Sequence, residues 1–428
     1  MKLNYKRTIL VGFAFFLISA FWGAYDAVVP LILTNLYEMP QDASGFIMSF
    51  DNILAVFMLP IFGSLSDKVS TRFGKRTPFI LFGTLAAVIS FVGLGLIQSK
   101  HLLPLFIIVL LLTLISMATF RSPAVALMPD VTVKPLRSKG NAIINLMGTA
   151  GGIIILLFGK IFKTGEPGKT DFLPYILGVC GVMLTGLIIF LFTVKENKWA
   201  KEMEDDSIKY NIDDTVENVS GGRKLSKEEK KSFLLILASV ALWYIGYNAV
   251  TSKYSVYATT VLGFDYNLTL LIANIAAIIS YIPVGIVASK IGRRKSILSG
   301  IVMLTSAFVL GCFLPKFGME AVTYPVFALA GIGWATINVN SFPMVVELAK
   351  GGDVGKYTGY YYTASMSAQI VTPILSGFLI ERVFGWGVFF PYAAIFAAAS
   401  FVTMFFVKHG DAKAEKVDAL SALGGADD

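Results

Sequence analysis

Long apolar runs separated by short charged stretches are the feature that most constrains how this chain can fold. A helix that spans a lipid bilayer needs roughly 20 mostly apolar residues. Measured against that length, the sequence contains candidate spans near residues 8–36, 44–66, 77–98, 102–128, 139–161, 172–194, 232–262, 266–289, 296–315, 322–347, 357–381 and 388–407. We therefore predict an all-α membrane protein with about twelve transmembrane helices, which lie in contact with lipid.

The composition agrees with a chain that is mostly embedded in lipid. Of its 428 residues, 55% are hydrophobic and only 15% are charged, and the mean hydropathy is +0.70. A soluble domain carries about 25% charged residues. The net charge of +8 does not indicate a nucleic-acid partner, because membrane proteins collect basic residues in their cytoplasmic loops.

Lysine and arginine in the short loops predict the orientation. One side collects Lys68, Arg72, Lys75, Arg76, Lys134, Arg137, Lys139, Lys290, Arg293, Arg294, Lys295, Lys350 and Lys356. The other side has Lys100, Lys160, Lys163, Lys169, Lys316 and Arg382. The richer side is predicted to be cytoplasmic, with both termini there. The N-terminal apolar run is long and lacks a small-residue cleavage site, so we interpret it as an uncleaved first helix.

A polar, charge-mixed segment divides the chain into two parts of similar length. We predict an N-terminal six-helix half over 1–194, a cytoplasmic linker over 195–231, a C-terminal six-helix half over 232–407 and a cytoplasmic tail over 408–428. The composition of the linker favours a solvated segment, helical in parts, over a binding role.

The two halves share a charged motif between their second and third helices. The stretch "GSLSDKVSTRFGKRTPFI", Gly63 to Ile80, is partly repeated as "GIVASKIGRRK", Gly285 to Lys295. A second correspondence places Asp130 and Glu347 alike, at the end of the fourth helix of each half. Two six-helix halves related by an axis along the membrane normal are the plan of a large class of secondary transporters.

The first of these stretches resembles the signature loop between helices 2 and 3 of the major facilitator superfamily. The residues before Gly74-Lys75-Arg76 and the "RTPFI" after it are similar to the sucrose-transporter-like (solute carrier 45-like) and glycoside–pentoside–hexuronide symporter branch. "ALMPDV…LRSKGNA", Ala126 to Ala142, and "AYDAVVP" in the first helix resemble the same branch. The resemblance implies a proton- or cation-coupled sugar carrier.

The charged loop suits a conformational latch. Asp67 at a helix end can pair with Arg72, Arg76 or Lys139, and such a pair biases two states that differ by a few kcal/mol. The alternative is that these charges only set the topology. The predicted latch residues are Gly63, Asp67, Arg72, Gly74, Lys75, Arg76, Asp130, Lys139, Gly285, Gly292, Arg293, Arg294 and Glu347.

Three ionisable residues inside predicted spans stand out, because charge within the membrane is costly and therefore marks a functional site. Arg121 precedes Asp130 by nine residues, about 13 Å of helix, which places it near the middle of the bilayer. Asp26 and Asp51 fall in the outer half. We predict that Arg121 binds substrate, with a structural ion pair as the alternative. We predict that Asp26 or Asp51 carries the coupled proton, with substrate hydrogen bonding or a plain polar contact as the alternatives.

The resemblance to the symporter branch refines this prediction. In that branch an arginine on helix 4 belongs to the sugar or proton site; here Val125 holds the aligned position and Arg121 lies one turn away on the same face. Cation-coupled members carry two acidic residues on helix 2, where this chain has Ala55 and Leu59. Protons are therefore predicted rather than sodium.

Aromatic and amide residues complete the predicted sugar site, because a sugar presents apolar C–H faces and a ring of hydroxyls. The predicted substrate contacts, besides the three charged residues, are Trp22, Asn52, Asn141, Asn145, Trp243, Tyr247, Asn248, Asn338, Tyr362 and Gln369. Tyr360 and Tyr361 are assigned to the membrane interface, and Lys253 is expected to snorkel at the outer end.

The sequence favours a proton-coupled symporter of a sugar or small glycoside, in a bacterial plasma (inner) membrane, acting as a monomer. An exporter of drugs or other amphipathic molecules and a non-transporting sugar sensor are the alternatives. An enzyme is not expected: no His lies in a predicted span, no phosphate-binding loop is present, and no metal or cofactor is predicted. Cys180 and Cys312 are expected to be buried thiols.

Overall fold

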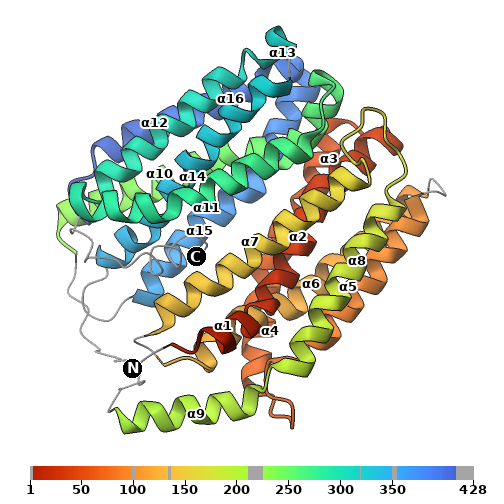
Figure 1. The fold of residues 1–428 in the computed structure, drawn as a ribbon. Coiled ribbons are helices and arrows are strands. Elements are labelled where there is room, and N and C mark those ends of the chain that lie inside the picture. The colour runs from red at the N-terminus through yellow and green to blue at the C-terminus, as the bar shows by residue number, and fades with distance from the viewer. Residues whose placement is uncertain are drawn as a thin grey trace. The chain divides into compact units, whose positions relative to one another are not determined.

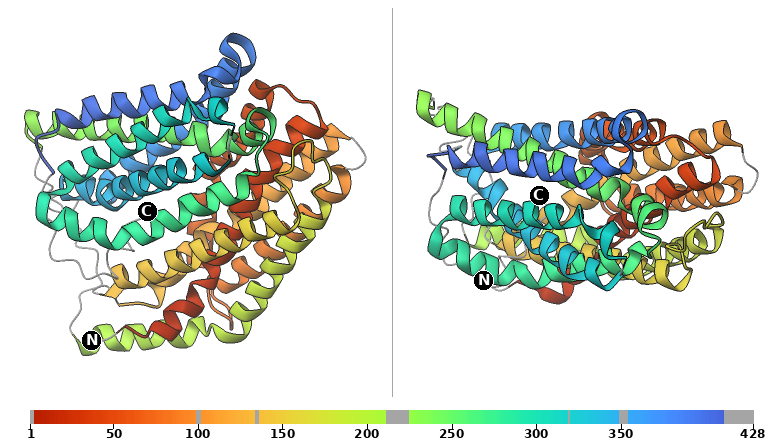
Figure 2. Two further views of the ribbon diagram at one scale, coloured as in Figure 1. Left: turned by 45° about the horizontal axis from the view of Figure 1, so that its top comes forward. Right: turned by 90° about the horizontal axis from the view of Figure 1, so that it is seen from above.

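The structure is a computed structural model that describes residues 3–98, 102–133, 136–210, 225–318, 320–348 and 354–410. Within these ranges all regular structure is helical (Figure 1). The chain forms two compact units: unit 1 contains Met1–Met39 and Phe50–Asp214, and unit 2 contains Pro40–Ser49 and Thr215–Asp428. In each unit the long helices run alongside one another (Figure 2).

Unit 1 is built from long helices joined by short turns. Its helices are α1 (Tyr5–Val11), α2 (Phe13–Leu31), the π-helical turn η1 (Ile32–Leu36), α4 (Phe50–Lys68), α5 (Thr77–Gln98), α6 (Leu103–Asp130), α7 (Arg137–Ile161), α8 (Leu173–Thr193) and α9 (Glu196–Lys209). Helix α2 packs against α7 and α8, and α6 packs against α4 and α5.

Unit 2 has the same style of construction. Its helices are α3 (Gln41–Met48), α10 (Lys227–Tyr257), η3 (Ala258–Leu262), α11 (Tyr266–Ile291), α12 (Arg293–Gly311), α13 (Leu314–Phe317), α14 (Glu320–Leu348), α15 (Val354–Phe378), η4 (Leu379–Phe384), η5 (Gly385–Val388) and α16 (Phe389–Phe405). Helix α14 packs against α11 and α12, and α10 packs against α15 and α16.

The helices confirm the predicted fold class. In the described residues, ten segments are long and apolar enough to cross a membrane. One of them, Tyr357–Phe405, contains two helices, α15 and α16, and a shorter apolar stretch, Tyr266–Tyr281, lies in α11. The result is consistent with the twelve predicted spans.

Local sequence signals fix several helix ends. Helix α10 begins with a capping box, in which the Ser226 side chain accepts from the Glu229 backbone N–H and Glu229 accepts from the Ser226 backbone N–H. The Asp265 side chain caps α11. Helix α11 ends at Ile291 and is followed by Gly292, whose φ of 93° is a conformation that glycine adopts easily. Helix α12 begins immediately afterwards.

Helix α3 packs on α15 through two glycines, within unit 2. A Cβ placed on Gly45 would lie 2.0 Å from the Pro373 carbonyl oxygen, and one placed on Gly377 would lie 2.3 Å from the Gln41 carbonyl oxygen. Because neither space would admit a side chain, the two backbones are in direct contact there.

Polar contacts hold the N-terminal end of α3. The Glu381 carboxylate accepts from the Gln41 backbone N–H at 2.8 Å, and Arg382 Nε donates to Asp42 at 2.8 Å. Lys253 of α10 donates through Nζ to the Gln41 carbonyl oxygen at 3.1 Å and is only 3% exposed. The expectation that Lys253 snorkels to the surface is therefore wrong, because its ammonium group finds acceptors inside unit 2.

Candidate functional site

Three charged residues from different helices of unit 1 converge. Asp26 comes from α2, Asp51 from the first turn of α4 and Arg121 from α6, and each lies within electrostatic reach of the other two. Sequence reasoning predicted each residue separately, and the fold brings them together. We call Asp26, Asp51 and Arg121 the charged cluster.

The two carboxylates of the charged cluster have different surroundings. Asp51 is half-buried, and its Oδ1 accepts from the backbone N–H of Asn52 at 2.6 Å and from the Asn52 side-chain amide at 2.7 Å. Asp26 is exposed, although Tyr25 and Ala27 on either side of it are buried. Asp51 is therefore held in one orientation, whereas Asp26 presents its carboxylate at the surface of α2.

Aromatic residues flank the charged cluster. The Arg121 guanidinium lies over the Trp22 ring, with its carbon 5.5 Å from the ring centroid, a favourable cation–π arrangement. Trp22 and Tyr25 meet edge to face at 5.3 Å. Among the described residues, Trp22 Nε1 and the Tyr25 hydroxyl are buried without a hydrogen-bond partner. Both are therefore polar groups that a ligand or water could satisfy.

Helix α7 carries the two predicted asparagines of unit 1. Asn145 is 4% exposed, and within the described part of the chain neither atom of its side-chain amide has a hydrogen-bond partner. An unpaired buried polar group costs about 1–3 kcal/mol. Asn145 is thus a strong candidate for a ligand contact. Asn141, one turn earlier, is half-buried.

Unit 2 contains a stacked aromatic surface. The rings of Tyr247 (α10) and Trp334 (α14) are parallel, at an interplanar angle of 3° with centroids 3.5 Å apart. Tyr244 meets Trp334 edge to face at 5.2 Å. All three side chains are half-buried. We call Tyr244, Tyr247 and Trp334 the aromatic platform.

The other predicted contacts of unit 2 have varied environments. Trp243 is fully buried and Asn338 is 9% exposed. Asn248, Tyr362 and Gln369 are half-buried. Trp243 thus packs inside unit 2, while Tyr244 and Tyr247 of the same helix form the platform.

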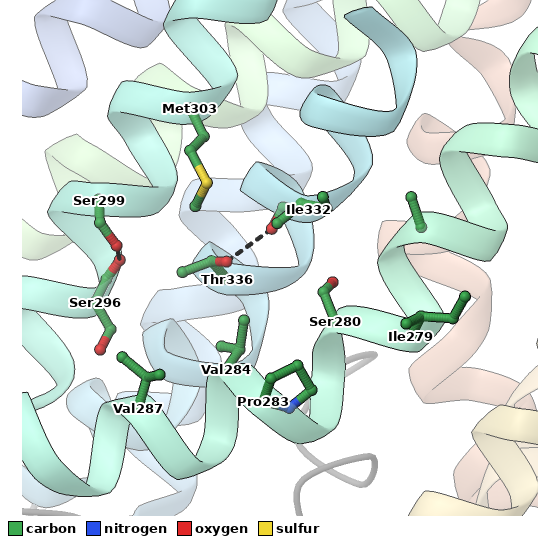
Figure 3. A pocket seen from close by; sticks show the side chains of 11 residues that line it. Ile279, Ser280, Pro283, Val284, Val287, Ser296, Ser299, Met303, Ile332 and Thr336 are labelled. Atoms are coloured by element: carbon green, nitrogen blue, oxygen red, sulfur yellow. Dashed lines mark hydrogen bonds between the residues drawn. The ribbon is translucent and has the colours of Figure 1, made fainter. Parts of the chain in front are cut away.

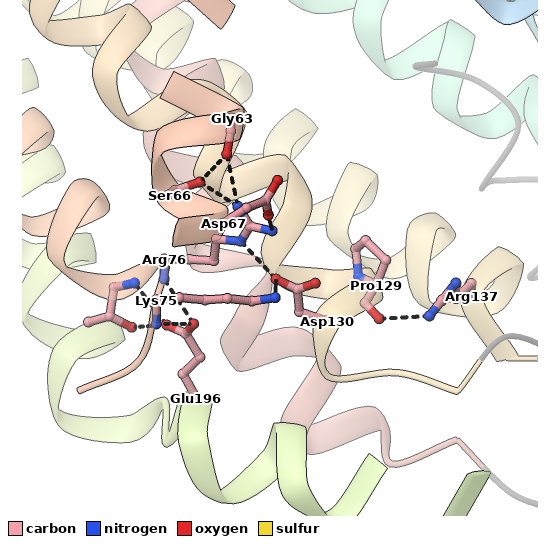
Figure 4. A network of polar contacts seen from close by, with 10 residues as sticks. Gly63, Ser66, Asp67, Lys75, Arg76, Pro129, Asp130, Arg137 and Glu196 are labelled. Carbon is pink, nitrogen blue, oxygen red and sulfur yellow. Dashed lines mark hydrogen bonds and ion pairs between the residues drawn. The ribbon is translucent and has the colours of Figure 1, made fainter. Parts of the chain in front are cut away.

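One network within unit 1 joins five of the predicted latch residues, Gly63, Asp67, Lys75, Arg76 and Asp130 (Figure 4). Arg76 Nε donates to Asp130 at 2.7 Å, its terminal nitrogens bond Asp67 and Ser66, and Lys75 pairs with Asp130 at 3.2 Å. Burial lowers the pKa of Arg76, but the hydrogen bonds and charges of Asp130 and Asp67 outweigh it and leave the pKa raised. Of the three predicted partners of Asp67, the structure selects Arg76.

Glu196, the first residue of α9, completes this network. Its carboxylate accepts from the backbone N–H groups of Lys75, Arg76 and Thr77 at 2.7–2.8 Å, and from the Thr77 hydroxyl at 2.7 Å. It therefore caps the N-terminus of α5. Gly74 has a φ of 123°, and a Cβ there would lie 2.1 Å from Glu196, so this close approach requires glycine.

Helix α9 differs from the predicted solvated linker. Trp199 is 8% exposed and Glu196 is 2% exposed. Arg7 pairs with Glu202 and lies over the Trp199 ring at 5.0 Å. This part of the linker is helical, as predicted. However, α9 is held against the rest of unit 1 by the Arg7–Glu202 ion pair and by the burial of Trp199 and Glu196.

The other predicted latch residues lie in several different elements. Gly63 accepts from Arg76 at 3.4 Å, and the Arg72 guanidinium lies over the Phe73 ring at 4.6 Å. Lys139 lies in the first turn of α7, and Gly285 lies in α11. Arg293 and Arg294 are the first two residues of α12, directly after Gly292. Arg294 donates to the Phe405 carbonyl oxygen at the end of α16. The side chain of Glu347 lies outside the described residues.

Two further predictions concern buried groups. Cys180 is buried and Cys312 is partly buried, and both are free thiols. Tyr361, predicted at the membrane interface, is instead 1% exposed and lies 3.0 Å from the Ser341 hydroxyl, whereas Tyr360 is 43% exposed. Among the described residues, no group of three metal-binding side chains is found.

Sequence reasoning missed several of these residues. Trp334 lies one helical turn before Asn338 on α14, so the four-residue spacing was a usable signal. Glu196 and the residues that hold α3 gave no such signal, because their partners lie far away in the sequence.

The sequence is similar to one known protein family. A sequence model of the Major Facilitator Superfamily matches residues 11–369 and 266–422. A search of curated proteins finds no match.

Several solved structures have a similar arrangement of helices. The inward-open xylose transporter XylE from E. coli is 13% identical, with a TM-score of 0.71 over 98% of this chain and 99% of that chain. The nucleoside transporter NupG is 16% identical, with a TM-score of 0.62 over 94% and 98%. A bacterial homologue of the human drug peptide transporters PepT1 and PepT2 is 12% identical, with a TM-score of 0.66 over 95% and 98%. At these identities the likeness concerns the fold alone.

Proposed function

Because the chain belongs to the Major Facilitator Superfamily, we propose that this membrane transporter is a proton-coupled symporter of a sugar or small glycoside. It would work by alternating access, without a cofactor. The proposal rests on the charged cluster, where three helices bring two carboxylates and a guanidinium together in a membrane-spanning unit.

The charged cluster suits both substrate binding and proton coupling. Arg121 presents donors in a planar fork that sugar hydroxyls can accept from, and Asn145 adds a buried amide. Asp26 and Asp51 share this one guanidinium, so the three groups carry a net negative charge when both carboxylates are ionised. Binding of a proton by one carboxylate neutralises that charge, which is the event that symport requires.

The aromatic platform supports a sugar rather than a wholly apolar substrate. Stacked rings offer a flat face to the C–H side of a sugar ring, and nearby amides such as Asn248 serve hydroxyls. The Asn248 side-chain nitrogen is buried without a partner among the described residues. An exporter of amphipathic molecules would need fewer placed polar groups.

Uptake into proteoliposomes tests the proposal. We expect a radiolabelled panel of mono- and disaccharides to include one that accumulates when only a pH gradient is imposed. A sodium gradient alone should have no effect, because Ala55 and Leu59 replace the acidic pair of cation-coupled carriers. Accumulation that requires sodium would contradict proton coupling, and no sugar flux under either gradient would favour an exporter or a sensor.

Replacing Trp334 tests the aromatic platform. Trp334→Ala should weaken binding of the transported sugar about tenfold, because an aromatic contact is worth about 0.5–1.5 kcal/mol beyond its buried area. Trp334→Phe should recover part of the affinity. Trp386→Ala serves as the control, since Trp386 contacts Tyr257 and Phe389 elsewhere in unit 2. Equal affinity in Trp334→Ala and wild type, by equilibrium binding, would show that the aromatic platform does not bind the sugar.

A further inference from the structure

Unit 2 has an apolar groove that is separate from the aromatic platform. Helices α11 and α12 each pack extensively on α14 but touch one another only briefly. The space between them has a volume of about 560 Å³, within the usual range of about 300–1,000 Å³ for ligand pockets. Its walls include Ile279, Pro283 and Val287 of α11 and Met303 of α12, and Ile332 of α14 forms its floor (Figure 3).

The chemistry of the walls does not suit a sugar. Four hydroxyls line the groove, but each donates its proton to a carbonyl oxygen of its own helix. These hydrogen bonds measure 2.7 Å for Ser280, 2.9 Å for Ser296, 2.7 Å for Ser299 and 2.7 Å for Thr336. With the donors occupied, the groove presents mainly hydrocarbon and favours an apolar occupant.

The length and position of the groove correspond to one leaflet of a bilayer. On α11 it runs from Ala276 to Val287, about 16 Å at 1.5 Å per residue, which is half of a hydrocarbon core roughly 30 Å thick. This stretch is the C-terminal half of α11, which covers Tyr266–Ile291. Ile279 is 68% and Val287 is 47% exposed, so the groove is open along its side.

Two lysines extend the walls at the end of the groove. Lys290 follows Val287 by three residues on α11, and Lys295 precedes Ser299 by four residues on α12, so each lies on the face that lines the groove. Both side chains are exposed. Arg294 instead donates to the carbonyl end of α16, which leaves the two lysines at the mouth.

We propose that this groove binds an anionic phospholipid, with one acyl chain between α11 and α12 and the phosphate at Lys290 and Lys295. Basic residues beside an apolar space between membrane helices are the expected receptor for an anionic headgroup. The surplus of basic residues predicts that this end faces the cytoplasm, where such lipids are available. Charge at the mouth and hydrocarbon below it match the two parts of the lipid.

Native mass spectrometry of the full-length, delipidated protein tests this proposal. Phosphatidylglycerol and phosphatidylcholine with the same acyl chains are titrated separately. We expect phosphatidylglycerol to bind at least tenfold more tightly, with one copy retained. The double variant Lys290→Ala/Lys295→Ala should weaken phosphatidylglycerol binding about 10- to 30-fold and leave phosphatidylcholine binding unchanged. Equal binding of the two lipids to the wild type would overturn the proposal, as would an unchanged preference in the double variant.

Matched controls separate this site from general charge and from a simple anion site. Lys227→Ala/Lys230→Ala removes two exposed lysines from the start of α10 and should keep the lipid preference. Ser299→Phe fills the groove from its exposed edge and should weaken phosphatidylglycerol binding without lowering the melting temperature. Glycerol phosphate should not compete with the lipid. Competition by glycerol phosphate at equal concentration would show an anion site and contradict the acyl-chain contact.

Discussion

Arg121→Ala should abolish substrate binding and transport while the protein still inserts and folds. Arg121 supplies the cationic group of the charged cluster, and its guanidinium can donate two hydrogen bonds to a sugar, each worth about 1.5–3 kcal/mol. The affinity for the transported sugar should therefore fall by at least about 30-fold. Equilibrium binding to purified protein measures this directly.

Two further variants make this result interpretable. Arg121→Lys keeps the charge but loses the planar fork, so it should recover only part of the affinity. Lys201→Ala removes one exposed positive charge from α9 and should bind sugar like wild type. Wild-type affinity in Arg121→Ala would show that the arginine only balances the carboxylates within unit 1.

Asp26→Asn should abolish uphill accumulation of sugar and leave exchange of internal for external sugar largely intact. We expect Asp26 to carry the proton because its side chain is exposed, whereas the Asp51 carboxylate accepts two hydrogen bonds from Asn52. An asparagine keeps the shape of the side chain but cannot carry the proton. Exchange does not require net proton movement, so it separates the two functions.

The comparison for this prediction is Asp51→Asn, with Asp205→Asn on α9 as a control for loss of an exposed carboxylate. Proteoliposome uptake driven by a pH gradient and counterflow of labelled sugar are measured for each variant. Loss of accumulation in Asp51→Asn but not in Asp26→Asn would assign the proton to Asp51. Normal accumulation in both would exclude the charged cluster from coupling.

The number and course of the helices could be predicted from the sequence because insertion depends on the length of each apolar run. Arg121, Asp26 and Asp51 could be found for a related reason: a charge inside an apolar run is visible without knowledge of the packing. The Arg76 network was also accessible, because Asp67 and Asp130 each fall in one of the two stretches that recur in the second half.

The lateral packing could not be predicted in the same way. Lipid-facing positions are as apolar as the core, so periodicity does not show which face of a helix is buried. Trp243 and Tyr244 are adjacent aromatic residues, yet one is buried and the other belongs to the platform. Lys253 and Glu196 find partners more than one hundred residues away, and a single sequence carries no record of those pairings.

The packing of α3 on α15 has a consequence for building chimeras and split versions of this transporter. A cut after Tyr210 would divide the sequence near its middle, but it would leave Pro40–Ser49 in the first fragment, although these residues belong to unit 2. That fragment would carry Gly45 and Asp42 without α15 and η4, whose residues Pro373 and Arg382 contact them. Exchange between homologues is therefore best made at Met39/Pro40 and Ser49/Phe50 as well, so that α3 travels with Gly377 and Arg382.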